Sequence, residues 1–423
     1  MSLGNLRSRA IERSPLKSAE FRAVIGVSLF IMFGFGLIVP TLPLFAKRFG
    51  VGEAGVGLLL TVFAATRLAA DFVAGSLIDR YGERTMAAIG AAIVGLSSIG
   101  AGAAPNYPAL VVLRGLGGVG SAFFLGALMA HLIAMVSAEE RGRAMSVFQA
   151  VLGIGFLLGP VFGGLLAEWS DLRTPLFVYG AICLACAPLV LRVMSRVAVP
   201  PDALAEAPAL ATEPVPGPSI RAWTRLRPLF SDSAYRAALI GSAAGFYVTG
   251  GLQTLIPGFW VDVLGREQGG VGLPFTVLSL ASLLVIWHAG SVSDRLGRKI
   301  TMVPALAVTA AACAVLGTIS SAVVLMFLMA VLGFAGGYSR PGPTAIVGDV
   351  APPDARGVAV AGYRTAGDVG ALIGPIVVGL VAEHLGYGPA FVAVAAMAAI
   401  AFVAAVLARE TAPSRRAAAP ARA

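Results

Sequence analysis

The sequence contains little charge for its length. Charged residues make up 13% of the 423 residues, whereas hydrophobic residues make up 57%. A soluble domain carries about 25% charged residues, so this chain has too few polar side chains to cover a water-exposed globule of its size. The shortage of charge excludes a soluble globular protein, and the mean hydropathy of +0.86 favours a membrane protein.

Cysteine is also scarce, with only Cys183, Cys186 and Cys313, and all three lie in apolar stretches. Cys183 and Cys186 have the spacing of a zinc or redox pair. However, no other thiol or imidazole lies near them in the sequence, and free cysteine packs well in apolar surroundings. We therefore expect neither a metal site nor a bound cofactor.

Long apolar runs separated by short polar breaks dominate the chain and indicate a polytopic membrane protein. With about 20 apolar residues required for each span, the sequence predicts an all-α protein with twelve transmembrane helices. Their expected limits are 22–46, 55–78, 86–104, 108–135, 143–167, 174–195, 236–263, 270–292, 301–319, 322–348, 357–382 and 388–409.

Polar segments divide the chain into five parts. Residues 1–21 are polar and basic, and the apolar stretch after them is too long for a signal-peptide core, so we expect a retained first span. Residues 196–235 are rich in proline and then in arginine, which predicts a linker without a core of its own. The predicted parts are a tail (1–21), a six-helix half (22–195), a linker (196–235), a second half (236–409) and a tail (410–423).

Basic residues are distributed unevenly around the predicted spans. Only Lys47, Arg48, Arg173 and Arg266 fall in loops on one side, and most of the others fall in the tails, the linker and the loops on the other side. The positive-inside rule then places both termini and the linker in the cytoplasm, as in a bacterial inner-membrane protein. The same distribution accounts for the net charge of +9 without nucleic acid.

Three separated landmarks recur at one fixed offset, which indicates an internal duplication. Asp79 recurs as Asp294 (294 − 79 = 215), Arg141-Gly142 recurs as 356–357, and Gly159-Pro160 recurs as 374–375. The sequence therefore predicts two pseudo-symmetric six-helix halves.

Six plus six helices with a cytoplasmic linker resemble the major facilitator superfamily, and the resemblance covers about residues 20–410. Its motifs are the loop signature Gly75…Asp79-Arg80…Gly82…Arg84 and its copy in the second half. The run Arg114–Gly117 resembles the family's arginine motif in helix 4, and 155–164 resembles the Gly-Pro signature of its proton-driven antiporters. The resemblance implies export of a lipophilic compound, driven by the proton gradient. Unlike many such exporters, helix 1 has no acidic residue between Arg22 and Lys47.

The loop signature resembles a latch between the two halves. Asp79 is expected to follow helix 2 at once and to bind the amino terminus of helix 11, where free N–H groups and the helix dipole favour an anion. A simple positive-inside anchor would explain the arginines but not Asp79. The predicted latch residues are Gly75, Asp79, Arg80, Gly82, Arg84, Gly290, Asp294, Arg295 and Gly297.

Four charges fall inside the predicted spans of helices 2 and 11. Arg67 and Asp71 share one face of helix 2 at i, i+4 spacing, as Arg364 and Asp368 do in helix 11. Burying them costs several kcal/mol each unless they are paired. We expect either a charge cluster across the seam between the halves, which would suit a proton switch, or two separate i, i+4 bridges. Arg114 is expected to take part in proton coupling.

The remaining candidates line the expected substrate cavity or act as hinges. Arg340, beside Pro341 in helix 10, would bind an anionic group, while aromatic side chains suit a lipophilic ligand. His131 and His288 are expected to pack within helices and not to relay protons. The predicted cavity residues are Phe33, Phe35, Phe246, Tyr247, Gln253, Trp260, Tyr338 and Arg340. The predicted rocking surfaces in helices 5 and 11 are Gly155, Gly159, Pro160, Gly163, Gly164, Gly374 and Pro375.

These features predict a proton-coupled exporter of lipophilic small molecules that works by alternating access. It would be embedded in the lipid bilayer and function as a monomer. An uptake symporter or uniporter for a small organic anion is the alternative, because lone arginines lie within spans. An enzyme is not expected, since the sequence has no nucleophile–base pair and no phosphate-binding loop.

Overall fold

The computed structural model describes residues 18–137, 140–194, 228–352 and 355–412. Within these ranges the chain is helical and contains no strand, and twelve helical segments are long and apolar enough to cross a membrane. The predicted all-α, twelve-span architecture is confirmed. The predicted linker lies largely outside the described residues.

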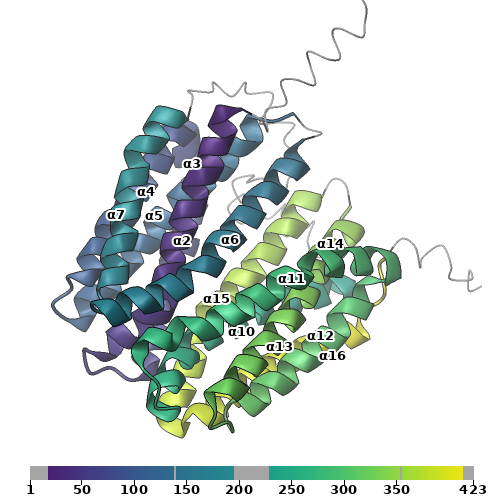
Figure 1. Cartoon of the computed structure of the whole chain (residues 1–423). Coiled ribbons are helices and arrows are strands. Elements are labelled where there is room, and N and C mark those ends of the chain that lie inside the picture. The colour runs from purple at the N-terminus through teal and green to yellow at the C-terminus, as the bar shows by residue number, and fades with distance from the viewer. Residues whose placement is uncertain (1–17, 138–139, 195–227, 353–354, 413–423) are drawn as a thin grey trace, which may run out of the picture.

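The first six spans form one bundle (Figure 1). Their bounds are α2 (Ala19–Lys47), α3 (Glu53–Tyr81), α4 (Glu83–Gly102), α5 (Tyr107–Ala134), α6 (Arg141–Trp169) and α7 (Thr174–Val193). Within this bundle α4 packs against both α5 and α7, and α2 packs against α6. The first helix starts three residues earlier than predicted, because the hydroxyl of Ser18 accepts a hydrogen bond from the Phe21 N–H and caps it.

The last six spans form the second bundle. Their elements are α10 (Ser233–Gly258), η3 (Phe259–Val263), η4 (Gln268–Gly272), α11 (Leu273–Leu296), α12 (Arg298–Leu316), α13 (Ala322–Ser339), α14 (Pro341–Val350), α15 (Arg356–Leu385) and α16 (Tyr387–Leu407). A short turn, η2 (Leu229–Ser231), precedes them. The segments α13 and α14 form one span that is interrupted at Arg340, and η3 is a π-helical turn that extends α10.

Single glycines join three pairs of consecutive helices. Gly82, Gly297 and Gly386 adopt φ values of 83°, 124° and 88°, a region that residues with a Cβ rarely enter. Gly82 and Gly297 are equivalent in the two halves (82 + 215 = 297) and set the same sharp turn. The turn comes later than predicted, so Asp79 and Asp294 lie in the last turns of α3 and α11 and not beyond them.

Helices inside each bundle approach closely at glycine. A Cβ on Gly90 of α4 would lie 2.5 Å from the backbone nitrogen of Phe124 in α5, and a Cβ on Gly163 of α6 would overlap the carbonyl of Leu37 in α2. In a lipid environment helices gain little from the hydrophobic effect, so close van der Waals packing at small residues holds them together.

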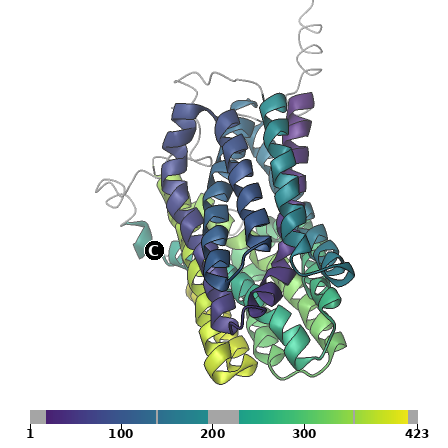
Figure 2. The same cartoon turned by 90° about the vertical axis from the view of Figure 1, so that its left-hand side faces the viewer.

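The two bundles meet mainly where α3 lies along α15 and where α6 lies along η4 and α11. Figure 1 shows them side by side, and Figure 2, turned by 90°, shows the helices of the first bundle running between two ends. We call the end at which α2 begins and α16 finishes the terminal end, and the opposite end the distal end. One apolar core crosses the seam at the distal end and includes Val56 of α3 and Val378 of α15.

Candidate functional site

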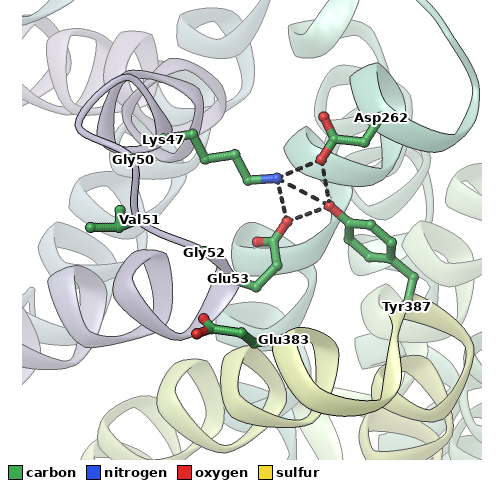
Figure 3. A pocket seen from close by; sticks show the side chains of 8 residues that line it. All are labelled: Lys47, Gly50, Val51, Gly52, Glu53, Asp262, Glu383 and Tyr387. Atoms are coloured by element: carbon green, nitrogen blue, oxygen red, sulfur yellow. Dashed lines mark hydrogen bonds and ion pairs between the residues drawn. The ribbon is translucent and has the colours of Figure 1, made fainter.

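The densest polar contact between the bundles lies at the distal end (Figure 3). Lys47 at the end of α2 places its Nζ 2.5 Å from an oxygen of Glu53, 2.6 Å from one of Asp262 and 3.1 Å from the hydroxyl of Tyr387. That hydroxyl also lies within hydrogen-bonding distance of Glu53 and, at 2.9 Å, of Asp262. Because a phenol has one proton, it donates to one carboxylate at a time and accepts from Lys47.

A second contact lies beside this one. The carboxylate of Glu383, near the end of α15, accepts a hydrogen bond of 2.9 Å from the Ala54 N–H in the first turn of α3. It satisfies a free donor and meets the positive end of the helix dipole. We call Lys47, Glu53, Asp262, Glu383 and Tyr387 the distal clasp; they surround a surface depression with a volume of about 520 Å³.

Internal symmetry explains where the distal clasp forms. Lys47 and Asp262 are equivalent positions of the two halves (47 + 215 = 262), and a contact between equivalent positions must lie on the axis that relates them. The contact between Glu383 and Ala54 has an equivalent in the other half. The equivalent positions are Glu168 (383 − 215 = 168) and Gly269 (54 + 215 = 269). A Cβ at position 269 would overlap the Glu168 carboxylate, so this second pair is also in contact.

Burial within the distal clasp is uneven. The side chain of Glu53 is 7% exposed, that of Lys47 is 21% exposed and that of Asp262 is 47% exposed. Polar contacts to Glu53 are therefore the least screened by water, whereas the Lys47–Asp262 pair is close to a surface ion pair in strength. The buried side of the clasp is where a change would matter most.

The cross-seam polar contacts between described residues that the structure resolves lie in its distal half. They join 47–61 of the first bundle to 262 or 372–387 of the second. The innermost is Thr61 of α3, which donates to the Leu372 carbonyl of α15 at 2.8 Å. These contacts fasten the two bundles at the distal end.

The predicted latch at the terminal end is not closed. Asp79 is exposed, and within the described part of the chain no hydrogen bond or ion pair joins it to the second bundle. Arg84 instead donates to the Leu191 carbonyl of its own bundle, and Arg80 lies over the Tyr81 ring. The predicted contact of Asp79 with the start of helix 11 is therefore absent from this structure, because the bundles are fastened at the opposite end.

The copy of the latch also makes contacts within its own bundle. Arg298, which follows Gly297, binds Asp294 and places its Nε 3.1 Å from Asp349 of α14. The carboxylate of Glu410 accepts hydrogen bonds from the backbone N–H groups of Arg298 and of residues 299, 411 and 412. Burial opposes its charge, yet these four donors hold the pKa of the Glu410 carboxyl below its usual value. These contacts of Arg298 and Glu410 all lie within the second bundle, and Gly290 takes no part in them.

The four charges predicted for helices 2 and 11 do come together. Arg67 and Asp71 of α3 interact electrostatically with Arg364 and Asp368 of α15: Asp71 with both arginines, and Asp368 with both arginines and with Asp71. No two of the four approach within the 4.0 Å of an ion pair, so the alternative of two i, i+4 bridges does not describe this state. Asp71 and Arg364 are exposed.

Arg114 lies apart from these four charges. Its side chain is 3% exposed, its guanidinium lies 4.6 Å from the Phe63 ring centre, and its Nε has no hydrogen-bond partner. No carboxylate in the described residues forms an ion pair with it. The arginine is therefore held by packing and a cation–π contact.

Several predicted cavity residues pack inside a bundle. Phe33 and Phe35 make ring contacts within the first bundle, Phe33 with Phe162 at 5.6 Å and Phe35 with Tyr179 at 6.3 Å. Trp260 is buried in η3 at the distal end and donates its indole N–H to the Glu267 carbonyl at 2.8 Å. These contacts give the three aromatic residues a packing role within their own bundles.

The other predicted cavity residues lie in the second bundle. Tyr247 is buried and Gln253 is half-buried in α10, whereas Phe246 is 53% exposed. Tyr338 is half-buried, with its hydroxyl 2.8 Å from the Nδ1 of the exposed His288. Arg340 is exposed at the α13–α14 junction.

Only part of the Gly-Pro runs touches the opposite bundle. Gly155, Gly159 and Gly163 pack against α2, and Gly374 packs against Tyr247, all within their own bundles. By contrast, Gly164 faces η4 across the seam, the Pro160 carbonyl meets Gly272, and the Pro375 carbonyl meets Gly57. The prediction that the whole runs form rocking surfaces is thus too broad, because α2 and α10 cover most of them.

Sequence reasoning missed the distal clasp. Lys47 and Asp262 were not singled out because each falls at a predicted helix end, where charge is ordinary. The available signal was the offset itself, which gives opposite charges at equivalent positions (262 − 47 = 215).

The two cysteines of the CxxC spacing are buried and unbonded, and the described residues contain no cluster of ligands for a metal ion. His131 packs in a buried position against Glu20 at 3.0 Å.

Comparison with known protein families identifies the family of this chain. The family model of the Major Facilitator Superfamily matches residues 24–270 and 264–423. The chain belongs to the Major Facilitator Superfamily. Membership identifies a multi-pass membrane transporter and not an enzyme.

Curated relatives match over part of the chain. Multidrug resistance protein 2 of Bacillus subtilis (strain 168) is 34% identical over 161 residues, which are 38% of this chain and 40% of that protein. The quinolone resistance protein NorA of Staphylococcus aureus is 27% identical over 160 residues, 38% of this chain and 41% of NorA. The matched segment thus spans about two fifths of the length of these relatives.

Solved structures share the fold over nearly the whole chain. A bacterial homolog of the human lysosomal transporter Spinster has a TM-score of 0.75 at 14% identity and covers 93% of this chain and 98% of its own. The D-xylose–proton symporter has a TM-score of 0.70 at 19% identity with the same coverages. At these identities the likeness concerns the fold alone.

Proposed function

We propose that this superfamily member exports lipophilic small molecules in exchange for protons by alternating access. The observation that carries the proposal is the fastening of the two bundles at the distal end. The distal clasp joins them there, while Asp79 and the four seam charges make no close ion pair across the seam in the described part of the chain. An alternating-access carrier must possess such a state.

The charge distribution supplies the orientation. Arginine-rich segments at the terminal end favour the cytoplasm, so the distal end faces outward across a bacterial inner membrane. The described state is then closed to the outside and fastened by the distal clasp. Opening to the outside requires Lys47, Tyr387 and their partners to separate.

The four seam charges are the proposed proton site. Asp71 and Asp368 lie on facing helices near Arg67 and Arg364. Neither carboxylate comes within ion-pair distance of either arginine. When the bundles rock, these distances change, so the cost of charging each carboxyl changes with the state. Such a site can take up a proton in one state and release it in the other without a cofactor.

Lipophilic cargo is supported by the relatives, whose names state multidrug and quinolone resistance. One chain supplies both halves and the whole seam, which fits a monomer as the working unit. The proton gradient would be the driving force.

The test uses the purified protein in liposomes with an internal pH dye and an imposed pH gradient. Lipophilic cations, neutral aromatic compounds and organic anions are added in turn. Proton movement opposite to cargo movement, lost in Asp71→Asn or Asp368→Asn, is the expected result. An unchanged pH dependence in both variants would remove the proposed proton site. Movement of protons together with an anion would replace export by uptake symport.

A further inference from the structure

Six charges lie about two helical turns or more from the ends of the described spans. The cations are Arg67, Arg114, Arg340 and Arg364, and the anions are Asp71 and Asp368. The two carboxylates lie near Arg67 and Arg364, and the buried Arg114 faces an aromatic ring. Arg340 is therefore an exposed cation without a counter-charge.

The surroundings of Arg340 are polar but neutral. Its guanidinium has no hydrogen-bond or ion-pair partner within the described ranges, and its electrostatic neighbour is Tyr363 of α15. The Tyr363 hydroxyl lies 3.1 Å from that of Thr344, four residues after Arg340 and so on the same face of the span. Tyr338, two residues before Arg340, is paired with His288.

An arginine in this position is costly without an anion. Surrounding protein atoms desolvate the guanidinium even though its side chain keeps accessible surface. Lipid would make the charge still less favourable, and intramembrane charges are generally paired or face a watered path. The exposed surface of Arg340 is thus best accounted for by a site that water or a ligand fills between the helices.

The duplicated architecture does not require this charge. The equivalent position in the first half is Leu125 (340 − 215 = 125), whereas the loop carboxylates Asp79 and Asp294 are present in both halves. The charge of Arg340 is therefore a feature of the second half alone.

We infer that Arg340 binds the carboxylate of a lipophilic organic acid as cargo. This inference rests on the proposed transport function and names its substrate class. A planar guanidinium receives a carboxylate through two parallel hydrogen bonds. Whichever hydroxyl of the Tyr363–Thr344 pair accepts their shared hydrogen bond has its own proton free to donate to the same group. The rings of Tyr338 and Tyr363 offer apolar surface to an aromatic body.

Binding to full-length protein in detergent, without any gradient, tests the inference. The probes are 2-naphthoate and its neutral isostere 2-naphthamide, compared by isothermal titration at neutral pH. Wild type should bind naphthoate at least about tenfold more tightly than naphthamide, as expected for a charge-assisted hydrogen bond. Arg340→Gln should lose that preference while it still binds naphthamide, and Arg340→Lys should restore part of it. Arg192→Gln, at an exposed arginine at the terminal end of α7, is the matched control.

Each outcome decides the matter. Equal binding of the two probes by wild type, binding of neither, or an undiminished preference in Arg340→Gln would overturn the inference. The proposed export function is tested separately. Proton-coupled export of cations without a preference for naphthoate would reject the carboxylate substrate class but not the export function. Naphthoate binding that depends on Arg340, without proton-coupled export, removes only the antiport mechanism.

Discussion

Removing one hydroxyl from the distal clasp should open the protein to the outside. In Tyr387→Phe the ring remains, but Glu53 loses a hydrogen bond and Lys47 and Asp262 lose a shared partner. All the contacts that this hydroxyl makes to Glu53 and Lys47 cross the seam. They therefore exist only while the distal end is closed, and their loss acts on the closed state alone.

The magnitude follows from burial. Glu53 is 7% exposed, and a hydrogen bond to a charged group at such a site contributes about 1.5–3 kcal/mol. The contact to Asp262 lies within the second bundle and does not depend on the seam, and the contact to Lys47 adds little because water screens it. A shift of about 1.5–3 kcal/mol raises the ratio of outward-open to closed protein roughly 10- to 150-fold.

The assay measures the outward-open population through the rate at which a thiol at the seam is labelled. The three native cysteines are replaced by alanine so that the reagent meets a single thiol, and Thr61→Cys then places this thiol at the innermost cross-seam hydrogen bond. A membrane-impermeant thiol reagent added to the distal side of sealed vesicles should modify this thiol only when the bundles part. The rate should rise roughly 10- to 150-fold in Tyr387→Phe.

Tyr107→Phe is the matched control. The Tyr107 hydroxyl donates to the Gly55 carbonyl at 2.7 Å, also at the distal end but within the first bundle. Its loss weakens a hydrogen bond of similar location without affecting the seam, so the labelling rate should stay near that of wild type. Equal rates in the Tyr387→Phe and Tyr107→Phe proteins would refute the assignment of the distal clasp as the outer gate.

Three further changes test the same reasoning. Lys47→Asp places a carboxylate against the acidic members of the clasp and should abolish net transport, while the double exchange with Asp262→Lys should recover a measurable part of it; no recovery would argue against a pair on the symmetry axis. Gly272→Ala introduces a methyl that overlaps a carbonyl of α6, so it should speed distal labelling, whereas Gly245→Ala, with open space around it, should not. Asp232 is held ionised by hydrogen bonds, first from an arginine after α16, which lower the pKa of its carboxyl. Its contribution to stability is therefore present above about pH 4 and lost as pH falls through the lowered value. Asp232→Asn keeps an acceptor for the cap of α10 but loses the charge, so it should lower the thermal unfolding temperature in detergent at pH 7 and flatten its decline below pH 4; an unaltered pH profile would contradict this.

Helices and their repetition could be predicted from the sequence because both depend on local pattern. A span requires a continuous apolar run, and the duplication is one fixed offset shared by three separated landmarks, of which Asp79 and Asp294 are one pair. The i, i+4 spacing of Arg67 and Asp71 also predicts that they share one face, and in the structure both interact electrostatically with charges of α15. Helix ends were less certain, since the positive φ of Gly82 and Gly297, and not the charge before them, sets where α3 and α11 stop.

The contacts between the halves were beyond the reach of the sequence. Lys47 and Asp262 are ordinary helix-end charges until the symmetry axis brings them together, and the predicted contact of Asp79 with the second bundle is not made in this structure. Likewise Arg114 and Arg340 look alike as lone cations in apolar runs, yet one is buried against a ring and the other is exposed. Local sequence determined which segments cross the membrane and that they occur twice. Only the tertiary structure decided which end is fastened and which charges lack a partner, because both depend on how two separately folded bundles are placed against each other.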